Sequence, residues 1–520
     1  MKPVLKVFTA EAIRTLDRRA AEHGVAPLLL MESAGRGAAA EISAWNRGLA
    51  TGRVLAVCGK GGNGGDALSA TRWLGLAGAD VQAVVLGTPH GPTAEQERAF
   101  RASFPDRLVA IRRAAELNVL RTRIAEADLV LDGILGIGLA QGARGLARGA
   151  IEIVVASGSP VVALDLPSGL VADCGAVPGP AVRAELTLAM GALKPCHLLP
   201  PAAGLCGEAR VVDVAYPPSV WDEVSPVAHV VDASFCGSLL PRRPRFGHKG
   251  TFGKILVVAG AVGMAGAAAL CAEGALRAGA GLVHVLCPEP VFPIVAALLP
   301  EALVHPGRAA DGMLSPEAAA EAVRRAQEMD LVVVGPGLGR GPGPKEVVHA
   351  LVASGVPLVV DADALFALAQ DPSLLRAGHG EIILTPHVGE FARLAAVDPD
   401  EAMSDKIRWA RGMARSSRAT VVLKGPPTAV SGGGDVYLTT TGNTALAHGG
   451  SGDVLAGMIG GLWAGGATPL AAAVVGAYVH GLAAELATAG ASERAALPRD
   501  VVGSLPWAFA SIEPEPRRDS

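Results

Sequence analysis

The sequence predicts two α/β domains in tandem, each built on a mostly parallel sheet with helices on both faces. Short apolar strands alternate with helical patterns through both halves of the 520 residues. Several strands run directly into Gly, Asp or Lys, and in parallel sheets ligands bind at the carboxyl ends of the strands. The chain length fits two to four domains of about 100–200 residues each.

In the first half, polar and glycine-rich segments follow the predicted strands. Helices are expected at 9–23, 31–45 and 66–78, and strands at 54–58, 81–86, 129–131 and 161–164. Thr9 and Ser33 stand near helix starts, where such residues are favoured. Asp132 and Asp165 each follow an apolar strand directly, so both are expected at the ligand-binding edge of the sheet.

A second alternating series begins after a proline-rich connection. Prolines cluster between 217 and 244 beside basic residues, which predicts domains at 1–214 and 245–520 joined by a linker at 215–244. The strands expected in the second domain are 254–259, 282–286, 331–334, 357–360, 382–384 and 420–423.

Composition excludes several classes of protein. Charged residues make up 18% and the net charge is -4, unlike the basic face of a nucleic-acid binder. The N-terminus lacks the apolar core of a signal peptide. The seven cysteines form no CxxC pair, so reduced thiols in a cytoplasmic protein are expected. Residues 454–479 carry no charge, but internal glycines and Pro469 favour two buried helices over a membrane span.

Residues 58–66, CGKGGNGGD, follow a strand and open a helix. Glycines let the backbone approach an anion closely, and a helix N-terminus attracts phosphate. The match to GxGxxG is weak, because the next strand ends in Leu86-Gly87-Thr88 instead of the acidic residue of a dinucleotide-binding Rossmann domain. The segment therefore predicts phosphate or nucleotide binding of another kind; a purely structural glycine turn is the alternative.

Four ordered motifs in the first half resemble the NAD(P)H-hydrate epimerase (YjeF N-terminal) family over about residues 9–214. They are LMESAG at 30–35, the glycine loop at 62–66, DGILGIG at 132–138 and DLPSG at 165–169. The resemblance implies a Rossmann-like three-layer αβα sandwich. The chain departs from the family at Gly62, where the first Asn of NNGGD is expected, and at Ile137, where GTG is expected. Whether these changes weaken epimerisation is left open.

The resemblance also implies roles for individual residues. The hydrated cofactor would contact Gly62, Asn63, Gly64, Gly65 and Asp66, together with Gly136, Ile137, Gly138, Leu139, Ala140, Gln141, Gly142 and Asp165. Asn63, Asp132 and Ser168 would give oxygens to a potassium ion. Asp165 would move protons during epimerisation, and Lys194 would give acid/base or electrostatic help. For Asp132 and Asp165 the alternative is a capping or turn residue, and for Lys194 a surface lysine.

In the second half, the sequence HGGSGD at 448–453 precedes a long apolar helical stretch. A glycine run that enters a helix forms an anion hole from backbone N–H groups. Asp453 at the helix start could accept a hydroxyl proton while the hole steadies a transferring phosphoryl group; a plain N-cap is the alternative. The strand at 420–423 ends in Lys424, which could hold a nucleotide phosphate.

These motifs resemble, in order, the ADP/ATP-dependent NAD(P)H-hydrate dehydratase family of the ribokinase-like superfamily. The match includes HKG at 248–250, FGK at 252–254 and LRAGAGLV at 276–283, and it runs from about 246 to 485. It implies a ribokinase-like αβα domain. The hydrated cofactor would contact Ala267, Gly337, Gly339, His387 and Asp453. The ADP or ATP would contact Lys424, Gly425, Pro426, Pro427, Thr428 and Gly452.

Taken together, the two resemblances imply a bifunctional repair enzyme that epimerises R and S NADHX or NADPHX and dehydrates the S hydrate at the expense of ADP or ATP. The implied cofactors are potassium and magnesium, the latter held mainly through the nucleotide phosphates. No nucleic-acid or membrane partner is expected. Neither the phosphate donor nor the oligomeric state follows from the sequence, although family members often assemble. The alternative is a ribokinase-like small-molecule kinase with a non-catalytic N-terminal nucleotide-binding module.

Overall fold

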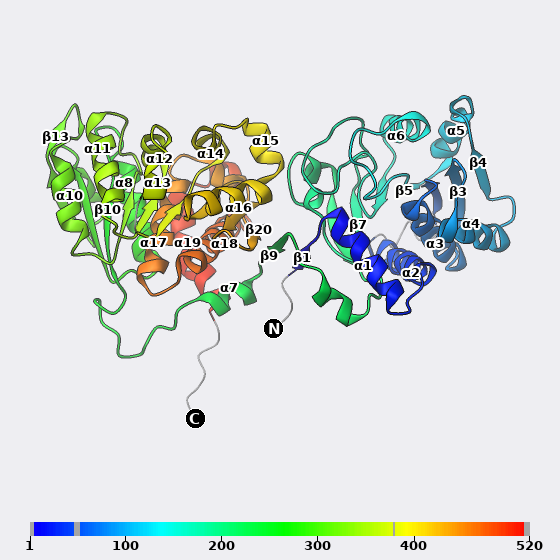
Figure 1. Ribbon diagram of the computed structural model, residues 1–520, viewed down its shortest axis with the longest axis horizontal. Coiled ribbons are helices and arrows are strands. Elements are labelled where there is room, and N and C mark those ends of the chain that lie inside the picture. The colour runs from blue at the N-terminus through cyan, green and yellow to red at the C-terminus, as the bar shows by residue number, and fades with distance from the viewer. Residues whose placement is uncertain (1–4, 46–51, 378–379, 514–520) are drawn as a thin grey trace. The chain divides into compact units, whose positions relative to one another are not determined.

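The computed structural model describes residues 5–45, 52–377 and 380–513 (Figure 1). The chain divides into two compact units, Leu5–Val227 with Met403–Asp405, and Ala228–Ala402 with the chain from Lys406 onward. The predicted linker at 215–244 differs from this division. Tyr216 and Val220 are buried in the core of the N-terminal unit, and the strand and helix that follow Val227 belong to the C-terminal unit.

The N-terminal unit is built on a seven-stranded parallel sheet with the order β4-β3-β2-β5-β6-β7-β8. Its strands are β2 (Arg53–Cys58), β3 (Asp80–Leu86), β4 (Leu108–Ile111), β5 (Leu129–Gly133), β6 (Val161–Leu164), β7 (Leu186–Met190) and β8 (Glu208–Val212), with β1 (Leu5–Val7) bridged to Leu193. The predicted parallel sheet is confirmed.

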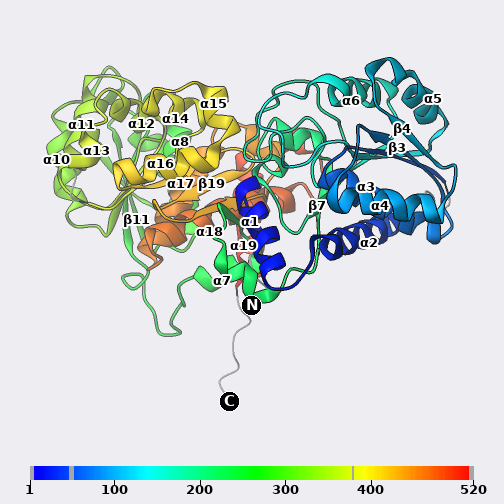
Figure 2. The same cartoon turned by 45° about the vertical axis from the view of Figure 1, so that its right-hand side comes forward.

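Helices cover both faces of this sheet, which makes three layers (Figure 2). Alternate residues of β2 show why, since Val54 and Ala56 pack with one cluster while Leu55 and Val57 pack with the other. One layer contains α1 (Ala10–Glu22), α2 (Pro27–Trp45), α3 (Gly62–Leu76) and α4 (Gly91–Ser103); the other contains α5 (Asn118–Glu126) and α6 (Gly145–Ser157). Strands that are buried on both faces are near-continuous apolar runs, as the central strand β6 is.

The C-terminal unit contains a larger mixed sheet with the order β9-β20-β19-β18-β17-β16-β15-β10-β11-β12. Its strands are β9 (Ala228–Val230), β10 (Lys254–Val258), β11 (Leu282–Pro288), β12 (Leu303–Gly307), β15 (Leu331–Val334), β16 (Leu358–Val360), β17 (Ile382–Leu384), β18 (Thr420–Leu423), β19 (Thr428–Ser431) and β20 (Val436–Thr439); β13 (Ala309–Ala310) and β14 (Met313–Leu314) form a separate hairpin. The predicted strands are present, but the antiparallel pairs β18–β19 and β19–β20 were not predicted.

Two helical layers also enclose this sheet. One contains α7 (Ala233–Leu239), α8 (Ala265–Arg277), α9 (Phe292–Leu298), α17 (Ser451–Ala464), α18 (Pro469–Ala487) and α19 (Pro498–Ile512). The remaining helices are α10 (Ala318–Ala326), α11 (Pro342–Ala353), α12 (Ala362–Ala369), α13 (Leu374–Ala377), α14 (Val388–Ala395), α15 (Pro399–Ser404) and α16 (Lys406–Ser417). Both alternate residue sets of the central strands are buried, so a layer packs on each face.

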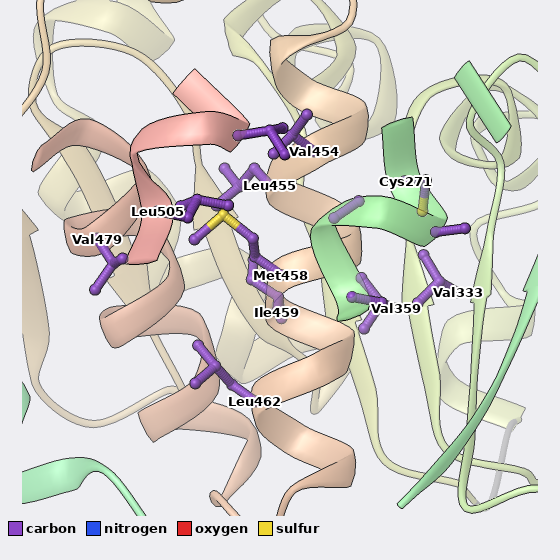
Figure 3. Close-up of a cluster of buried hydrophobic side chains, with 14 of the residues drawn as sticks. Cys271, Val333, Val359, Val454, Leu455, Met458, Ile459, Leu462, Val479 and Leu505 are labelled. Carbon is purple, nitrogen blue, oxygen red and sulfur yellow. The ribbon is translucent and has the colours of Figure 1, made fainter. Parts of the chain in front are cut away.

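The apolar stretch 454–479 forms the centre of the C-terminal core. It divides into α17 and α18 around Gly465 and Pro469, as predicted. Figure 3 shows Met458 and Ile459 of α17 packed among Cys271 of α8, Val479 of α18 and Leu505 of α19. Helix α18 is long and apolar enough to span a membrane by composition, but 72% of that window is buried within the protein. The interpretation as a core helix therefore accounts for its composition.

Glu32, in the LMESAG motif on α2, connects α2 to α3 and α4 through hydrogen bonds. Its carboxylate accepts hydrogen bonds from Ser69, Arg72 and Trp73 of α3 and from Gln96 of α4. Partial burial would raise the pKa of Glu32, but these hydrogen bonds prevail and lower it. The glutamate of this motif thus joins α2, α3 and α4 within the helical layer.

We predict that Glu32→Ala destabilises the N-terminal unit by about 2–3 kcal/mol, because four donors lose one shared acceptor. Glu41→Ala on the same helix is the matched control, since Glu41 accepts a partly buried contact from the single residue Arg210, and we expect it to cost less than about 1 kcal/mol. Scanning calorimetry of the full chain measures both. Equal shifts for the two variants would contradict the role given to Glu32.

Candidate functional site

The N-terminal unit has a pocket of about 840 Å³ at the carboxyl ends of its strands. Its walls come from the start of α3, the segment after β5 and the ends of β6 and β7. The predicted ligand residues Gly62, Asn63, Gly64, Asp66, Gly136, Ile137, Gly138, Leu139 and Asp165 line it. Ala140, Gln141, Gly142 and Gly65 were also predicted to contact ligand, but they lie outside this lining.

Close backbone contacts shape the floor of the pocket. Helix α3 begins at Gly62, four residues before its predicted start, so 62–66 is the first helical turn instead of a loop. A Cβ at Gly64 would lie 1.9 Å from the carbonyl oxygen of Gly59, and a Cβ at Gly136 would lie 3.3 Å from Asp165 Oδ2. Glycine at these positions brings the α3 N-terminus, the segment after β5 and Asp165 together.

Asp165 follows β6 in the left-handed region, with φ 63, a conformation that costs a non-glycine residue energy and is found at functional sites. The fully buried Lys194 donates from Nζ to Asp165 Oδ1 at 2.5 Å and to the Met190 carbonyl at 2.8 Å. Lys194 lies outside the pocket lining. Its buried place removes the alternative of a surface lysine, and it acts on the pocket through Asp165.

His197 fixes the backbone of this ion pair. Its Nδ1 accepts from the Lys194 N–H at 3.0 Å, so Nε2 carries the proton and donates to the Asp165 carbonyl at 2.8 Å. Burial, with the nearby Lys194 charge, lowers the pKa of His197 to about 4. The ring is therefore neutral at physiological pH and holds Asp165 and Lys194 at a constant separation.

Asp132 and Ser168, two of the predicted potassium ligands, are fully buried and hydrogen-bonded to each other. The third, Asn63, lines the pocket, and Asn63 and Ser168 both contact the Leu135 backbone. Ser168 donates from Oγ to Asp132 Oδ1 at 2.6 Å and from its backbone N–H to Oδ2 at 2.7 Å. Asn63 donates from Nδ2 to the carbonyl of Leu135 at 2.9 Å, and its Oδ1 is buried without a hydrogen-bond partner. Burial raises the pKa of Asp132 to about 6 against these hydrogen bonds.

Two pocket residues escaped the sequence analysis. The Tyr216 hydroxyl donates to Asp17 Oδ1 at 2.6 Å, and both side chains line the pocket. Tyr216 falls in the segment assigned to the linker, and no local pattern connects it to Asp17, which lies 199 residues earlier.

Asp66, a predicted ligand residue, is also affected by its neighbours in the pocket. Burial and the neighbouring carboxylates of Asp165 and Asp17 raise the pKa of Asp66 well above its ordinary value.

The C-terminal unit gathers charged residues at the corresponding edge of its sheet. Lys424, directly after β18, donates from Nζ to Asp361 Oδ1 at 2.7 Å, and Asp361 directly follows β16. Glu390 Oε2 lies 3.9 Å from the same Nζ. A Cβ at Gly452 would lie 3.3 Å from Lys424 Nζ, so the first turn of α17 reaches this ion pair.

Asp453 occupies that first turn. Burial and the repulsion of Asp361 raise the pKa of Asp453 to about 7, partly opposed by Lys424. The N–H groups at the start of a helix lack intrahelical partners, and Gly450, with φ 101, introduces the turn. The arrangement places a carboxylate with a near-neutral pKa beside an anion-binding helix N-terminus.

The residues predicted to contact the hydrated cofactor in this unit also include Ala267, Gly337, Gly339 and His387. A Cβ at Gly337 would lie 2.8 Å from Ala267 Cβ, and Gly339 donates its N–H to Asp363 Oδ2 at 3.0 Å. His387 caps α14, with Nδ1 accepting from the N–H groups of Gly389 and Glu390. Its Nε2 lies 3.4 Å from Glu390 Oε1, and the side chain is 61% exposed.

Four of the predicted nucleotide residues, Lys424, Gly425, Pro426 and Pro427, form a tight turn between β18 and β19, and the fifth, Thr428, is the first residue of β19. The turn contains the cis bond Pro426–Pro427 and a left-handed Gly425 with φ 110. Lys406 at the start of α16, which belongs to none of the sequence motifs, donates to two carbonyl oxygens of this turn. Gly425 and Pro426 are exposed, whereas Pro427 is buried.

Comparisons with known proteins match both units to described families. NAD(P)H-hydrate dehydratase matches residues 255–506, and YjeF-related protein N-terminus matches residues 28–196. The bifunctional NAD(P)H-hydrate repair enzyme Nnr of Moorella thermoacetica is 37% identical, with 98% of this chain and 97% of that protein covered. The protein of that name from Escherichia coli is 33% identical, with 87% and 84% covered.

A crystal structure of ADP/ATP-dependent NAD(P)H-hydrate dehydratase from Bacillus subtilis, co-crystallised with ATP/Mg²⁺, also resembles part of the chain. It is 32% identical, covers 54% of this chain and 98% of that chain, and has a TM-score of 0.47.

We predict that Gly64→Ala destabilises the N-terminal unit by about 1–3 kcal/mol, because the new methyl group would overlap the Gly59 carbonyl. Gly62→Ala in the same helical turn is the control. A Cβ there meets no atom within 4 Å, and alanine favours helix by up to about 1 kcal/mol. Thermal unfolding of the full chain compares the two variants. A Gly64→Ala protein as stable as the Gly62→Ala protein would refute the close approach.

Proposed function

This chain belongs to the family of bifunctional NAD(P)H-hydrate repair enzymes, and from that premise we propose which residues carry its two reactions. The N-terminal unit is the NAD(P)H-hydrate epimerase and the C-terminal unit is the nucleotide-dependent dehydratase. One site would interconvert the R and S hydrates of NADH or NADPH, and the other would return the S hydrate to the reduced cofactor.

The observation that carries the epimerase assignment is the Lys194–Asp165 ion pair at the wall of the pocket. The α3 N-terminus, opened by glycines, would hold the phosphates of the hydrated cofactor. Asp165 would exchange a proton with the substrate at the hydrated ring carbon. Lys194 would hold the Asp165 carboxylate in place, and His197 would hold the Asp165 backbone through its carbonyl oxygen.

Asn63, Asp132 and Ser168 offer oxygen atoms that fit a potassium ion. The unpartnered Asn63 Oδ1 is an oxygen donor without a role of its own, and Asp132 and Ser168 add hard oxygens. We propose that all three would hold the ion. Potassium would supply positive charge below the segment after β5, which Asn63 and Ser168 already contact at Leu135.

The observation that carries the dehydratase assignment is Asp453, with its raised pKa, at the start of α17 beside Lys424. We propose that Asp453 removes the proton of the substrate hydroxyl while the hydroxyl oxygen attacks the terminal phosphoryl group of the nucleotide. The first N–H groups of α17 would stabilise the charge on that group. Phosphate then leaves with the former hydroxyl oxygen, a neighbouring carbon loses a proton, and the ring double bond of NADH or NADPH is restored.

The nucleotide would lie against Lys424–Thr428 and Gly452, and the hydrated cofactor against Ala267, Gly337, Gly339 and His387. Among the residues that the structure describes, no group of three or more His, Cys, Asp or Glu side chains could hold a metal. We propose that a magnesium ion is bound mainly through the nucleotide phosphates. It would neutralise phosphate charge.

We predict that kcat/KM for dehydration of the S hydrate rises with pH and levels off above about pH 7, because Asp453 must be ionised to accept a proton. Below its raised pKa of about 7, the rate should fall about tenfold per pH unit. Absorbance at 340 nm follows the reduced nicotinamide that forms.

In the same assay, Asp453→Asn should lose dehydration at every pH, because an amide cannot take up the proton. Asp330→Asn is the matched control: Asp330 lies at the opposite end of β15, where it accepts the Lys254 N–H, so the wild-type profile should be kept. An active Asp453→Asn enzyme, or a flat wild-type profile through pH 7, would overturn the role of Asp453.

We predict that Asp165→Asn slows epimerisation at least about 100-fold without changing dehydration of the S hydrate. With a mixture of R and S hydrates, this variant should convert the S fraction and then stall at the spontaneous epimerisation rate.

Asp128→Asn is the control for Asp165→Asn, since Asp128 precedes β5 at the far end of the sheet and accepts the Arg53 N–H. It should leave both rates unchanged. If Asp165→Asn epimerises as fast as the control, Asp165 is not the proton carrier.

A further inference from the structure

Lys406 is a buried lysine that none of the motifs contains. It is the first residue of α16 and only 1% exposed. A buried ammonium is costly unless it is paired or hydrogen-bonded, so its contacts must offset that cost. The chain has few lysines and many arginines, yet a lysine occupies this place.

The Lys406 ammonium contacts the turn between β18 and β19. Nζ donates to the Lys424 carbonyl at 3.1 Å and to the Pro427 carbonyl at 3.0 Å. A Cβ at Gly425 would lie 2.8 Å from the same nitrogen. One ammonium therefore ties both ends of the turn and packs directly under its middle.

These contacts determine where the turn directs its N–H groups. In a trans peptide, the carbonyl oxygen and the following N–H point in opposite directions, and the Lys424–Gly425 bond is trans. Because the Lys424 carbonyl points inward to the buried ammonium, the N–H of the exposed Gly425 points away from it. A left-handed glycine with an outward N–H is suited to bind an anion.

The ammonium also places charge behind the turn. Burial lowers the pKa of Lys406 to about 8, so most molecules carry the proton at neutral pH. The Lys424 ammonium, at the start of the same turn, is already neutralised in part by Asp361 and Glu390. Lys406 contacts carbonyl oxygens, so its positive charge adds to the attraction for phosphate.

We propose that Lys406 is a positioning residue for the nucleotide: it holds the 424–428 turn so that Gly425 presents its N–H to a nucleotide phosphate. The inference rests on the nucleotide site proposed above. Lys406 would therefore affect binding of the nucleoside di- or triphosphate and would not affect recognition of the hydrated cofactor.

The test compares Lys406→Met, which keeps the length of the side chain and removes the ammonium, with Arg415→Met. Arg415 lies on the same helix and donates from Nε to the Gly433 carbonyl, outside the nucleotide turn. For the full-length protein, KM for ADP or ATP and KM for the S hydrate are measured separately. Calorimetric titration with Mg-ADP and with Mg-ATP reports binding without turnover.

We expect Lys406→Met to raise the KM and Kd for the nucleotide about tenfold or more, with KM for the hydrate and the Arg415→Met values unchanged. Lys406→Arg, which keeps the charge, should recover part of the loss. An equal rise in both KM values, or an unchanged nucleotide Kd, would overturn the proposal. If Lys406→Met does not fold, Lys406→Arg is compared with Lys406→Gln. Wild-type nucleotide affinity in both variants would overturn the proposal. A loss of nucleotide affinity in Lys406→Gln alone would support it.

Failure of the proposed function gives a different result. In that case the wild-type protein does not convert the hydrate, whereas nucleotide binding by wild type and variants can still be compared by titration. The role of Lys406 is then judged on those affinities alone.

Discussion

A lysine ammonium that faces an aspartate carboxylate lies at the carboxyl edge of the sheet in each unit, and both candidate sites depend on this contact. Lys194 meets Asp165 at 2.5 Å, and Lys424 meets Asp361 at 2.7 Å. An unpaired charge at either place would cost several kcal/mol of desolvation free energy. Each pair therefore restricts the side-chain positions of its site, and the substrate meets groups that are already oriented.

Glycines let the helix N-termini reach these pairs. In the N-terminal unit, Gly64 packs against the Gly59 carbonyl, and Gly136 lies between Asn63 and Asp165. In the C-terminal unit, a Cβ at Gly335 would lie 1.9 Å from the Asp361 carbonyl, and Gly452 approaches Lys424. The two sites thus use one principle, in which close backbone contact brings a helix N-terminus beside a fixed carboxylate.

Local patterns in the sequence predicted most of the fold and part of each site. Apolar runs located the central strands because these are buried on both faces, and glycine runs marked helix N-termini. Strands β4, β7, β8 and β12 were not predicted. The start of α3 was placed too late, because glycines at 62, 64 and 65 disfavour helix, and tertiary contacts with Met31 and Gly59 override that preference. The antiparallel strands after β18 were missed because the turn at 424–428 was interpreted only as a ligand site.

The residues that escaped prediction act across large sequence separations. Tyr216 reaches Asp17, and Glu390 reaches Lys424, only after the chain has folded. Lys406 looks like an ordinary first residue of an amphipathic helix. His197 orients Asp165 through backbone atoms, and no side-chain pattern records such a contact.

The central claim is that one chain carries two complementary repair activities. Absorbance at 340 nm during incubation of mixed R and S NADHX with the wild-type protein, Mg²⁺ and ADP or ATP tests it most directly. We expect recovery of all the NADH, faster than spontaneous epimerisation allows. Recovery that stalls at the S fraction would contradict an active epimerase, and no recovery with either nucleotide would contradict the repair function.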